Sequence, residues 1–294
     1  MNSDILVSEP MRGAHTLSPP TFSVPAGACD SHVHVFGPET SYPSVDKPHY
    51  TLPDGNLPQL RNMARALNLQ RFVIVQPSFY GTDNSCMLDA LDAAGTRARG
   101  VAMVNEQVSD ADLQDMHVRG VRALRLDLFL RSSLPVSELI AYIERSVRRT
   151  EAFGWHVQFY TPGWVVRNLL PFLAELQADF VVDHMGYMLE SDGLTRNDFD
   201  RLLKVIAEGR GWIKLSAPYR LARDGNFDRL GPLVKAVLDA APSRVIWGSD
   251  WPHIPQGSRD TGELLNLLAA WVADAEVLTR VLVNNPARLF GFGE

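Results

Sequence analysis

The chain has 294 residues, of which 46% are hydrophobic and 21% are charged, and its formal net charge is −6. This composition is that of an ordinary globular protein and excludes a disordered or fibrous chain. The acidic balance gives no overall positive field for nucleic acid or an anionic membrane surface, so an anionic ligand would need a local group of positive charges.

The two cysteines, Cys29 and Cys86, form neither a paired metal-ligand spacing nor a disulfide framework. The chain does not open on a basic segment followed by an apolar run, and no stretch approaches the roughly 18 apolar residues of a membrane span. We therefore expect a cytoplasmic protein that binds neither a membrane nor nucleic acid. These features do not indicate an oligomeric state.

Residues 1–25 are expected to form an extended N-terminal lead-in, and residues 26–294 a single domain. In the domain, short apolar runs alternate with amphipathic segments. Most of the runs do not alternate with polar residues, which is typical of parallel strands that are buried on both faces. The eight expected strands are 28–36, 71–76, 99–104, 121–128, 155–160, 180–184, 212–216 and 244–248.

Helical periodicity fills the segments between these runs, and Ser109 with Asp112 and Thr195 with Asp198 have the spacing of capping boxes. Eight units of strand followed by helix predict an α/β protein with the (β/α)8 TIM-barrel fold. An open doubly wound sheet is the alternative fold. It is disfavoured because no glycine-rich phosphate loop follows the first expected strand.

A long irregular segment, residues 37–56, follows the first expected strand and contains four prolines. In a barrel this segment would lie at the end that carries the active site. Two interpretations remain open, namely a cover over the active site and a structural Ω-loop.

Histidine and aspartate side chains follow three of the expected strands. His32 and His34 are two residues apart, so both would point to the same side of the first strand. His184 ends the sixth strand and Asp250 follows the eighth. TIM-barrel enzymes place their chemistry at the carboxyl ends of the strands, so the sequence predicts one active site that contains all four residues.

The segments CDSHVHVFGP, VVDHMG and VIWGSDWPH, together with VQPSFYGTDN from Val75, resemble the amidohydrolase superfamily. The resemblance extends from Ala28 to Phe290 and is strongest to the lactonase branch that contains the pyrone-dicarboxylate hydrolases. It implies a hydrolase of aromatic catabolism that opens a carboxylated lactone, such as 2-pyrone-4,6-dicarboxylate. Asp250 would be the general base that activates water, and His32, His34 and His184 would polarise the carbonyl group.

The resemblance also implies a small anionic lactone as substrate. Arginines bind carboxylates through paired hydrogen bonds, and three of them follow expected strands. The substrate-binding residues expected from the resemblance are Arg125, Arg131, Arg220, Tyr160, His253, Ser78 and Tyr50. Two positions depart from the pattern of the branch: Asp127 replaces a neutral amide and Tyr80 replaces a histidine. The carboxylate of Asp127 could pair with Arg125 and weaken its hold on substrate.

The resemblance to the pyrone-dicarboxylate hydrolases implies that no metal is required. A two-metal centre is disfavoured by the residues themselves: the fourth strand offers Arg125 and Asp127 but no bridging lysine or glutamate. His156 begins the fifth strand, at the end of the barrel away from the site. A single Zn²⁺ held by the four candidate catalytic residues is the alternative.

Three other functions are alternatives to the hydrolysis of a dicarboxylate lactone. A sugar-acid lactonase or a muconolactone-type hydrolase would use the same site without needing the group of arginines. A decarboxylase or hydratase of the same superfamily would use one metal ion. A barrel that binds a ligand without catalysis is disfavoured, because each mapped catalytic position holds a competent residue.

Overall fold

The computed structural model describes residues 17–45, 52–53, 55–188, 194–254 and 259–293. Tyr50, residues 1–16 of the expected lead-in and part of the 37–56 segment lie outside these ranges. In the described part of the lead-in, residues 17–25 contain no helix or strand. Ser18 there donates hydrogen bonds from its amide and hydroxyl groups to the carboxylate of Asp260.

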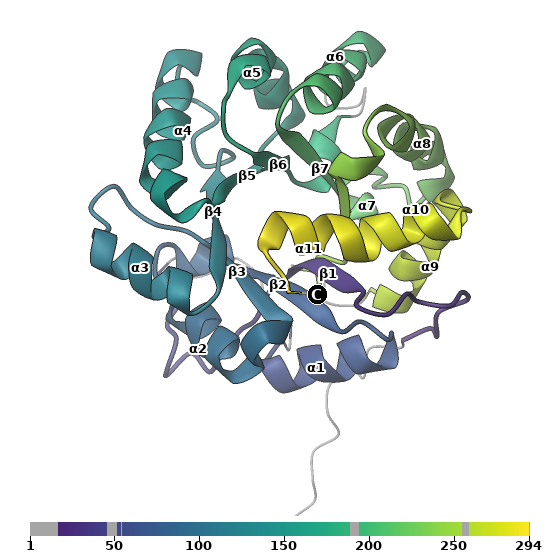
Figure 1. Cartoon of the computed structure of the whole chain (residues 1–294), viewed down its shortest axis with the longest axis horizontal. Helices are drawn as coiled ribbons and strands as arrows, with labels where there is room; N and C mark the ends of the chain where they lie inside the picture. Colours follow the sequence, from purple (N-terminus) through teal and green to yellow (C-terminus); the bar gives the residue numbers. More distant parts are fainter. Residues whose placement is uncertain (1–16, 46–51, 54, 189–193, 255–258, 294) are drawn as a thin grey trace, which may run out of the picture.

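Eight parallel strands form one sheet in the order β1 to β8, which confirms the predicted TIM barrel. Figure 1 shows the strands as an inner ring that is surrounded by helices. Each strand begins within one residue of the start of an expected run, and its end lies up to three residues before the expected one. The strands are β1 (Cys29–Val33), β2 (Arg71–Val75), β3 (Ala98–Ala102), β4 (Val121–Asp127), β5 (His156–Tyr160), β6 (Phe180–Val182), β7 (Gly211–Ser216) and β8 (Val245–Gly248).

The helices return the chain between strands and pack their apolar residues on the outside of the ring. Both predicted capping boxes are present, at Ser109 before α3 and at Thr195 before α6. None of the helices within the described ranges is long and apolar enough to cross a membrane. The helices are α1 (Leu57–Ala66), α2 (Ser85–Ala94), α3 (Asp110–Val118), α4 (Val136–Thr150), α5 (Gly163–Glu175), α6 (Arg196–Glu208), α7 (Pro218–Leu221), α8 (Gly231–Ala240), α9 (Thr261–Trp271), α10 (Ala275–Thr279) and α11 (Asn285–Phe290).

Two backbone hydrogen bonds join the first strand to the segment after the last one. The amide of Asp250 donates to the carbonyl of His32 over 2.9 Å, and the amide of His34 donates to the carbonyl of Trp251 over 2.8 Å. The carboxylate of Asp30 strengthens this junction by accepting from the amides of His32 and Ser249. Barrel closure therefore brings His32, His34 and Asp250 together.

The two ends of the barrel interior differ in polarity. Near the amino ends of the strands, buried apolar side chains fill the interior and Phe290 of α11 packs among them. His156 lies at this end, beside Phe290, as expected from its place at the start of β5. At the opposite end the strands finish in polar and charged side chains. The apolar interior group comprises Cys29, Val73, Val75, Val101, Ala123, Val181, Trp212, Ile246, Phe290 and Phe292.

Candidate active site

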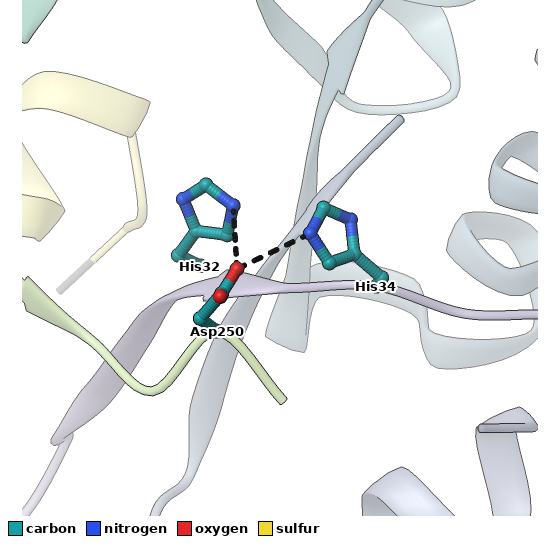
Figure 2. Close-up of side chains that lie close together, drawn as sticks. All are labelled: His32, His34 and Asp250. Atoms are coloured by element: carbon teal, nitrogen blue, oxygen red, sulfur yellow. Dashed lines mark ion pairs between the residues drawn. The ribbon is translucent and has the colours of Figure 1, made fainter. Parts of the chain in front are cut away.

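The two histidines of the first strand lie inside the barrel mouth, where Figure 2 shows them on either side of Asp250. His32 is fully buried and packs against β8 at Gly248, where a Cβ atom would lie only 2.5 Å from the Cβ of His32. Any side chain at position 248 would therefore displace His32. His34 donates from Nδ1 to the carbonyl oxygen of Val75 over 2.8 Å, which fixes its ring and leaves Nε2 facing the site.

Asp250 lies at the centre of the site and has a left-handed backbone conformation, with φ of 67°. Its Oδ1 atom is 3.6 Å from Nε2 of His32 and 3.5 Å from Nε2 of His34 (Figure 2). Its Oδ2 atom accepts a hydrogen bond from the hydroxyl of Tyr219 over 2.7 Å. The same atom accepts two from Arg220, from Nε over 2.9 Å and from Nη2 over 2.8 Å.

These contacts determine the charge of Asp250. Burial alone would raise the pKa of its carboxyl group, but the charge of Arg220 and the hydrogen bonds around it outweigh burial and hold the pKa well below its usual value. Asp250 is therefore a carboxylate at neutral pH. One oxygen is held by Arg220 and Tyr219, and the other remains available to a ligand in the mouth.

Arg220 reaches Asp250 because the chain turns sharply after β7. Ala217 has a left-handed conformation, with φ of 47°, and the short helix α7 begins at the next residue. The guanidinium group also donates to the backbone carbonyl of Ile254 over 3.0 Å. Arg220 was predicted to bind substrate, and the structure places it at the mouth but pairs it with Asp250.

His184 approaches the site from the opposite side, directly after β6. Its backbone is left-handed, with φ of 51°, and its Nδ1 lies 2.8 Å from the hydroxyl oxygen of Ser216. Burial lowers the pKa of His184 to about 4, so the ring is neutral at physiological pH. The remaining ring nitrogen is free to face a bound ligand.

A cavity of about 350 Å³ opens above these residues, at the carboxyl ends of the strands. Six of the predicted site residues besides Asp250 line it: His34, His184, Arg125, Arg220, Tyr160 and Ser78. His32 lies just beneath. The volume suits a small ligand. Two arginines, Arg125 and Arg220, and two carboxylates, Asp127 and Asp250, line the cavity, so positive groups are available to an anion only at particular places in it.

Arg125 is the second arginine of this cavity. Its guanidinium carbon lies 4.6 Å from the centre of the Tyr160 ring, and its Nη1 donates to the carbonyl of Gln76 over 2.6 Å. The carboxylate of Asp127 accepts from the hydroxyl of Ser78 over 2.6 Å and from the amide of Leu130 over 3.2 Å. Asp127 thus takes these two partners, and the anticipated pairing with Arg125 does not form.

Arg131 and His253 do not line this cavity. Arg131 lies over the ring of Tyr142 at 4.3 Å, beside a neighbouring cavity. His253 is buried behind Tyr219, with Nδ1 at 3.3 Å from the Tyr219 hydroxyl and Nε2 at 2.9 Å from the hydroxyl of Thr261. His253 therefore helps to hold the Tyr219 hydroxyl in place and does not face the cavity. Tyr50, the remaining predicted residue, is outside the described ranges.

A polar layer that the sequence analysis does not predict lies directly beneath the mouth and consists of Lys214, Asp183 and Gln158. Lys214 of β7 and Asp183, which follows β6, are both completely buried, and Nζ lies 3.0 Å from Oδ1. Gln158 of β5 donates to the other oxygen of Asp183 over 2.9 Å. A signal was available for Lys214: it is the one charge in the apolar run GWIKLS, in register with Trp212 and Ser216 on the inner face.

Histidine and aspartate atoms come close enough to suggest a metal site. Two groups of three residues have ligand atoms within 4.8 Å of one another: His32, His34 and Asp250, and His32, Asp183 and His184. His34 suits a metal, because its Nδ1 proton is donated to Val75 and Nε2 keeps a lone pair. His32 does not, because its Nδ1 lies 3.1 Å from the Lys214 ammonium and must accept there, which places the ring proton on Nε2. His32 would have to be a ligand in both groups, so neither group of residues is suited to hold a metal ion tightly.

Comparisons with known proteins place this geometry in a family. The family model described as Amidohydrolase matches residues 29–292. A 2-pyrone-4,6-dicarboxylate hydrolase of Comamonas testosteroni is 35% identical, over 93% of this chain and 93% of its own length. A 4-sulfomuconolactone hydrolase of Rhizobium radiobacter is 31% identical, over 96% of each chain.

A solved structure agrees with these relatives. The crystal structure of a probable 2-pyrone-4,6-dicarboxylic acid hydrolase from Acinetobacter baumannii, with citric acid bound, has a TM-score of 0.79 and 29% identity. The match covers 90% of this chain and all of that one. The predicted resemblance is confirmed, and the chain belongs to the amidohydrolase family.

Proposed function

We propose that this protein is a lactonase that hydrolyses a small carboxylated lactone, of which 2-pyrone-4,6-dicarboxylate is the first candidate. One observation carries the proposal: a single small cavity is lined by the Asp250 carboxylate, the imidazoles of His34 and His184, and two arginines. Relatives that align along nearly the whole chain are named hydrolases of anionic lactones, one a dicarboxylate and one a sulfonate. A role in the breakdown of aromatic compounds agrees with both names.

Asp250 is the proposed general base. A water molecule between Oδ1 of Asp250 and Nε2 of His34, which are 3.5 Å apart, would donate to both. Its oxygen attacks the lactone carbonyl carbon while its proton passes to Asp250. The ring C–O bond then breaks, and the same proton returns to the departing ring oxygen, so the product is a ring-opened carboxylic acid.

The three histidines take different parts in this proposal. Nδ1 of His184 lies 2.8 Å from the hydroxyl of Ser216, a group that can donate or accept. The proposal assigns the hydroxyl as the donor, so that Nε2 of His184 carries a proton and polarises the substrate carbonyl. His34 holds the attacking water. His32 lies beneath the cavity and directs its Nε2 proton towards Asp250.

Arg125 and Arg220 are the proposed carboxylate ligands. Arg125 is buried against Tyr160 and is held in place by Gln76, so its guanidinium group is already oriented. Arg220 is shared between the cavity and Asp250. A substrate carboxylate that binds Arg220 weakens its hold on Asp250 and makes that carboxylate a stronger base when substrate is present.

The test is a continuous absorbance assay of the pure protein with 2-pyrone-4,6-dicarboxylate and with 4-sulfomuconolactone, each with and without a strong chelator. We expect loss of the pyrone signal at a rate that the chelator does not change. Turnover of the sulfonate alone would keep the lactonase proposal and change the substrate. No turnover of either compound, nor of sugar-acid lactones, would contradict the proposal.

A further inference from the structure

A buried ammonium group lies directly beneath the proposed catalytic histidines. Lys214 is 0% exposed, and its Nζ is 3.0 Å from Oδ1 of Asp183 and 3.1 Å from Nδ1 of His32. An ammonium group can only donate hydrogen bonds. Nδ1 of His32 must therefore accept from it through its lone pair, and Oδ1 of Asp183 forms an ion pair with it.

Burial lowers the pKa of Lys214, and the charge of Asp183, 3.0 Å away, opposes this shift and favours the ammonium form. Burial alone would raise the pKa of Asp183, but Lys214 and the nearby histidines outweigh burial and hold this pKa below its usual value. A neutral amine at position 214 would leave a buried carboxylate without a compensating charge, which is costly in a protein interior. The pair is therefore buried as ammonium and carboxylate, and Gln158 completes the hydrogen bonds of Asp183.

This pair determines where the proton of His32 lies. Burial, and then the charge of Lys214, holds the pKa of His32 well below its usual value, so the ring is neutral and carries one proton. Because Nδ1 accepts from Lys214, that proton is on Nε2. The N–H group then points towards Oδ1 of Asp250, 3.6 Å away (Figure 2).

A histidine that binds a metal has the opposite arrangement. Its ligating nitrogen has a free lone pair, and its other nitrogen donates a proton to a carboxylate or carbonyl group. Here a carboxylate is available, since Oδ1 of Asp183 lies 3.6 Å from Nδ1 of His32. Lys214 contacts both atoms and takes the place of that hydrogen bond.

We propose that Lys214 is a positioning residue that keeps the proton of His32 on Nε2, the nitrogen that faces Asp250, and thereby prevents tight binding of a divalent metal. Each group of described residues that could hold a metal contains His32, so this single contact affects both groups. The ammonium also adds a positive charge next to any cation that would enter. The part that concerns Asp250 rests on the proposed function, whereas the part that concerns the metal does not.

The first test replaces Lys214 with methionine, which has a similar length and no charge. In Lys214→Met, Nδ1 of His32 can donate to Asp183 and Nε2 becomes a ligand. We expect Zn²⁺ affinity, measured by titration calorimetry, to rise about 10–100-fold, and about one Zn²⁺ to remain bound after gel filtration. The matched control is Lys235→Met, because Lys235 is an exposed lysine paired with an aspartate on α8.

A second variant covers the case in which the single variant does not fold. Lys214→Met/Asp183→Asn removes both charges, and the new amide oxygen can still accept from His32. We expect this variant also to bind Zn²⁺ more tightly than the unmodified protein. If every folded variant of Lys214 binds Zn²⁺ no more tightly than the unmodified protein, the proposal is overturned.

Nuclear magnetic resonance of ¹⁵N-labelled histidine rings supplies a readout that needs no metal and no substrate. We expect the His32 signal, assigned by its loss in His32→Gln, to show the proton on Nε2 in the unmodified protein. In Lys214→Met it should show the proton on Nδ1. A proton on Nδ1 in the unmodified protein would overturn the proposal, even if the protein proves to be an active lactonase.

Discussion

Two acid–base pairs lie one above the other in the barrel, and their surroundings differ. Asp250 and Arg220 form the upper pair, where the arginine side chain is 22% exposed and both residues line the cavity. Asp183 and Lys214 form the lower pair, and both side chains are 0% exposed. The upper pair can exchange partners with a ligand, whereas the lower pair can act only by orienting its neighbours. In the proposed mechanism, the pair at the mouth serves catalysis and the similar pair one layer below serves positioning.

The largest effect is expected from the acid of the upper pair. Asp250→Asn keeps the shape of the side chain but removes the proton acceptor, so kcat should fall about 10⁴-fold while the protein remains folded. Steady-state kinetics and circular dichroism measure the two quantities. Asp239→Asn, at an exposed pair on α8, is the control and should leave kcat unchanged. A near-normal kcat in Asp250→Asn would remove Asp250 from the mechanism.

The second prediction concerns the pH dependence of stability that His156, a buried histidine near the lower pair, contributes. Burial, and then the charge of Lys214, lowers the pKa of His156 to about 3. Its ordinary value is 6.5, so between pH 6.5 and pH 3 the unfolded chain binds a proton that the folded one does not. The stability from this group is complete above pH 6.5 and is lost as the pH falls, at about 1.4 kcal/mol per pH unit.

Denaturant titrations between pH 7 and pH 4.5 measure this loss. His156→Gln should reduce the slope of unfolding free energy against pH by that amount. Asp30 contributes a pH dependence of the opposite sign, because burial raises its pKa to about 6. Asp30 is present in both the unmodified protein and His156→Gln, so the difference between their slopes gives the contribution of His156. Equal slopes in the two proteins would show that His156 is not held neutral.

The third prediction distinguishes the arginine inside the cavity from the one beside it. Arg125→Met removes a fixed guanidinium group from the cavity, and KM for a dicarboxylate lactone should rise about 10–100-fold. Arg131→Met is the matched control, because Arg131 lies over Tyr142 outside this cavity, and its KM should change less than threefold. The reverse order of effects would place the substrate in the neighbouring cavity.

The smallest effect is expected at the support of the lower pair. Gln158→Leu removes the hydrogen bond to Oδ2 of Asp183 and should lower the free energy of unfolding by about 1–3 kcal/mol. KM should stay the same, because Gln158 does not line the cavity. Thermal unfolding and kinetics test both statements. A large rise in KM would show that the lower layer contacts substrate.

The sequence predicts the eight strands, and it indicates four candidate catalytic residues at or after strand ends, because both depend on local patterns. An apolar run of β-branched and aromatic residues specifies a buried strand, and a histidine or aspartate at its carboxyl end is visible without knowledge of the fold. His32, His34, His184 and Asp250 were found in this way, and the structure brings all four together.

The partners of the other predicted residues depend on backbone turns that a pattern does not reveal. Arg220 bends back to Asp250 because Ala217 is left-handed, a conformation that alanine rarely adopts. His253 is also left-handed and turns away from the cavity towards Thr261. Lys214 was missed for a different reason. It lies in the middle of β7, whereas the pattern that indicates a barrel active site is a charge at the end of a strand.

The junction between β1 and the segment after β8 has a consequence for how the protein matures. The amide of Ser249 donates to Asp30, 219 residues earlier in the chain, and Asp250 and His34 are held by the neighbouring backbone hydrogen bonds. Contacts of such long range form late in folding, because a long loop must be closed first. A chain that has not yet docked its last strand has His32 and His34 in place but not Asp250. In the proposed mechanism, hydrolysis would begin only when the ring is complete, and protection of the Asp250 amide from hydrogen exchange would report that step.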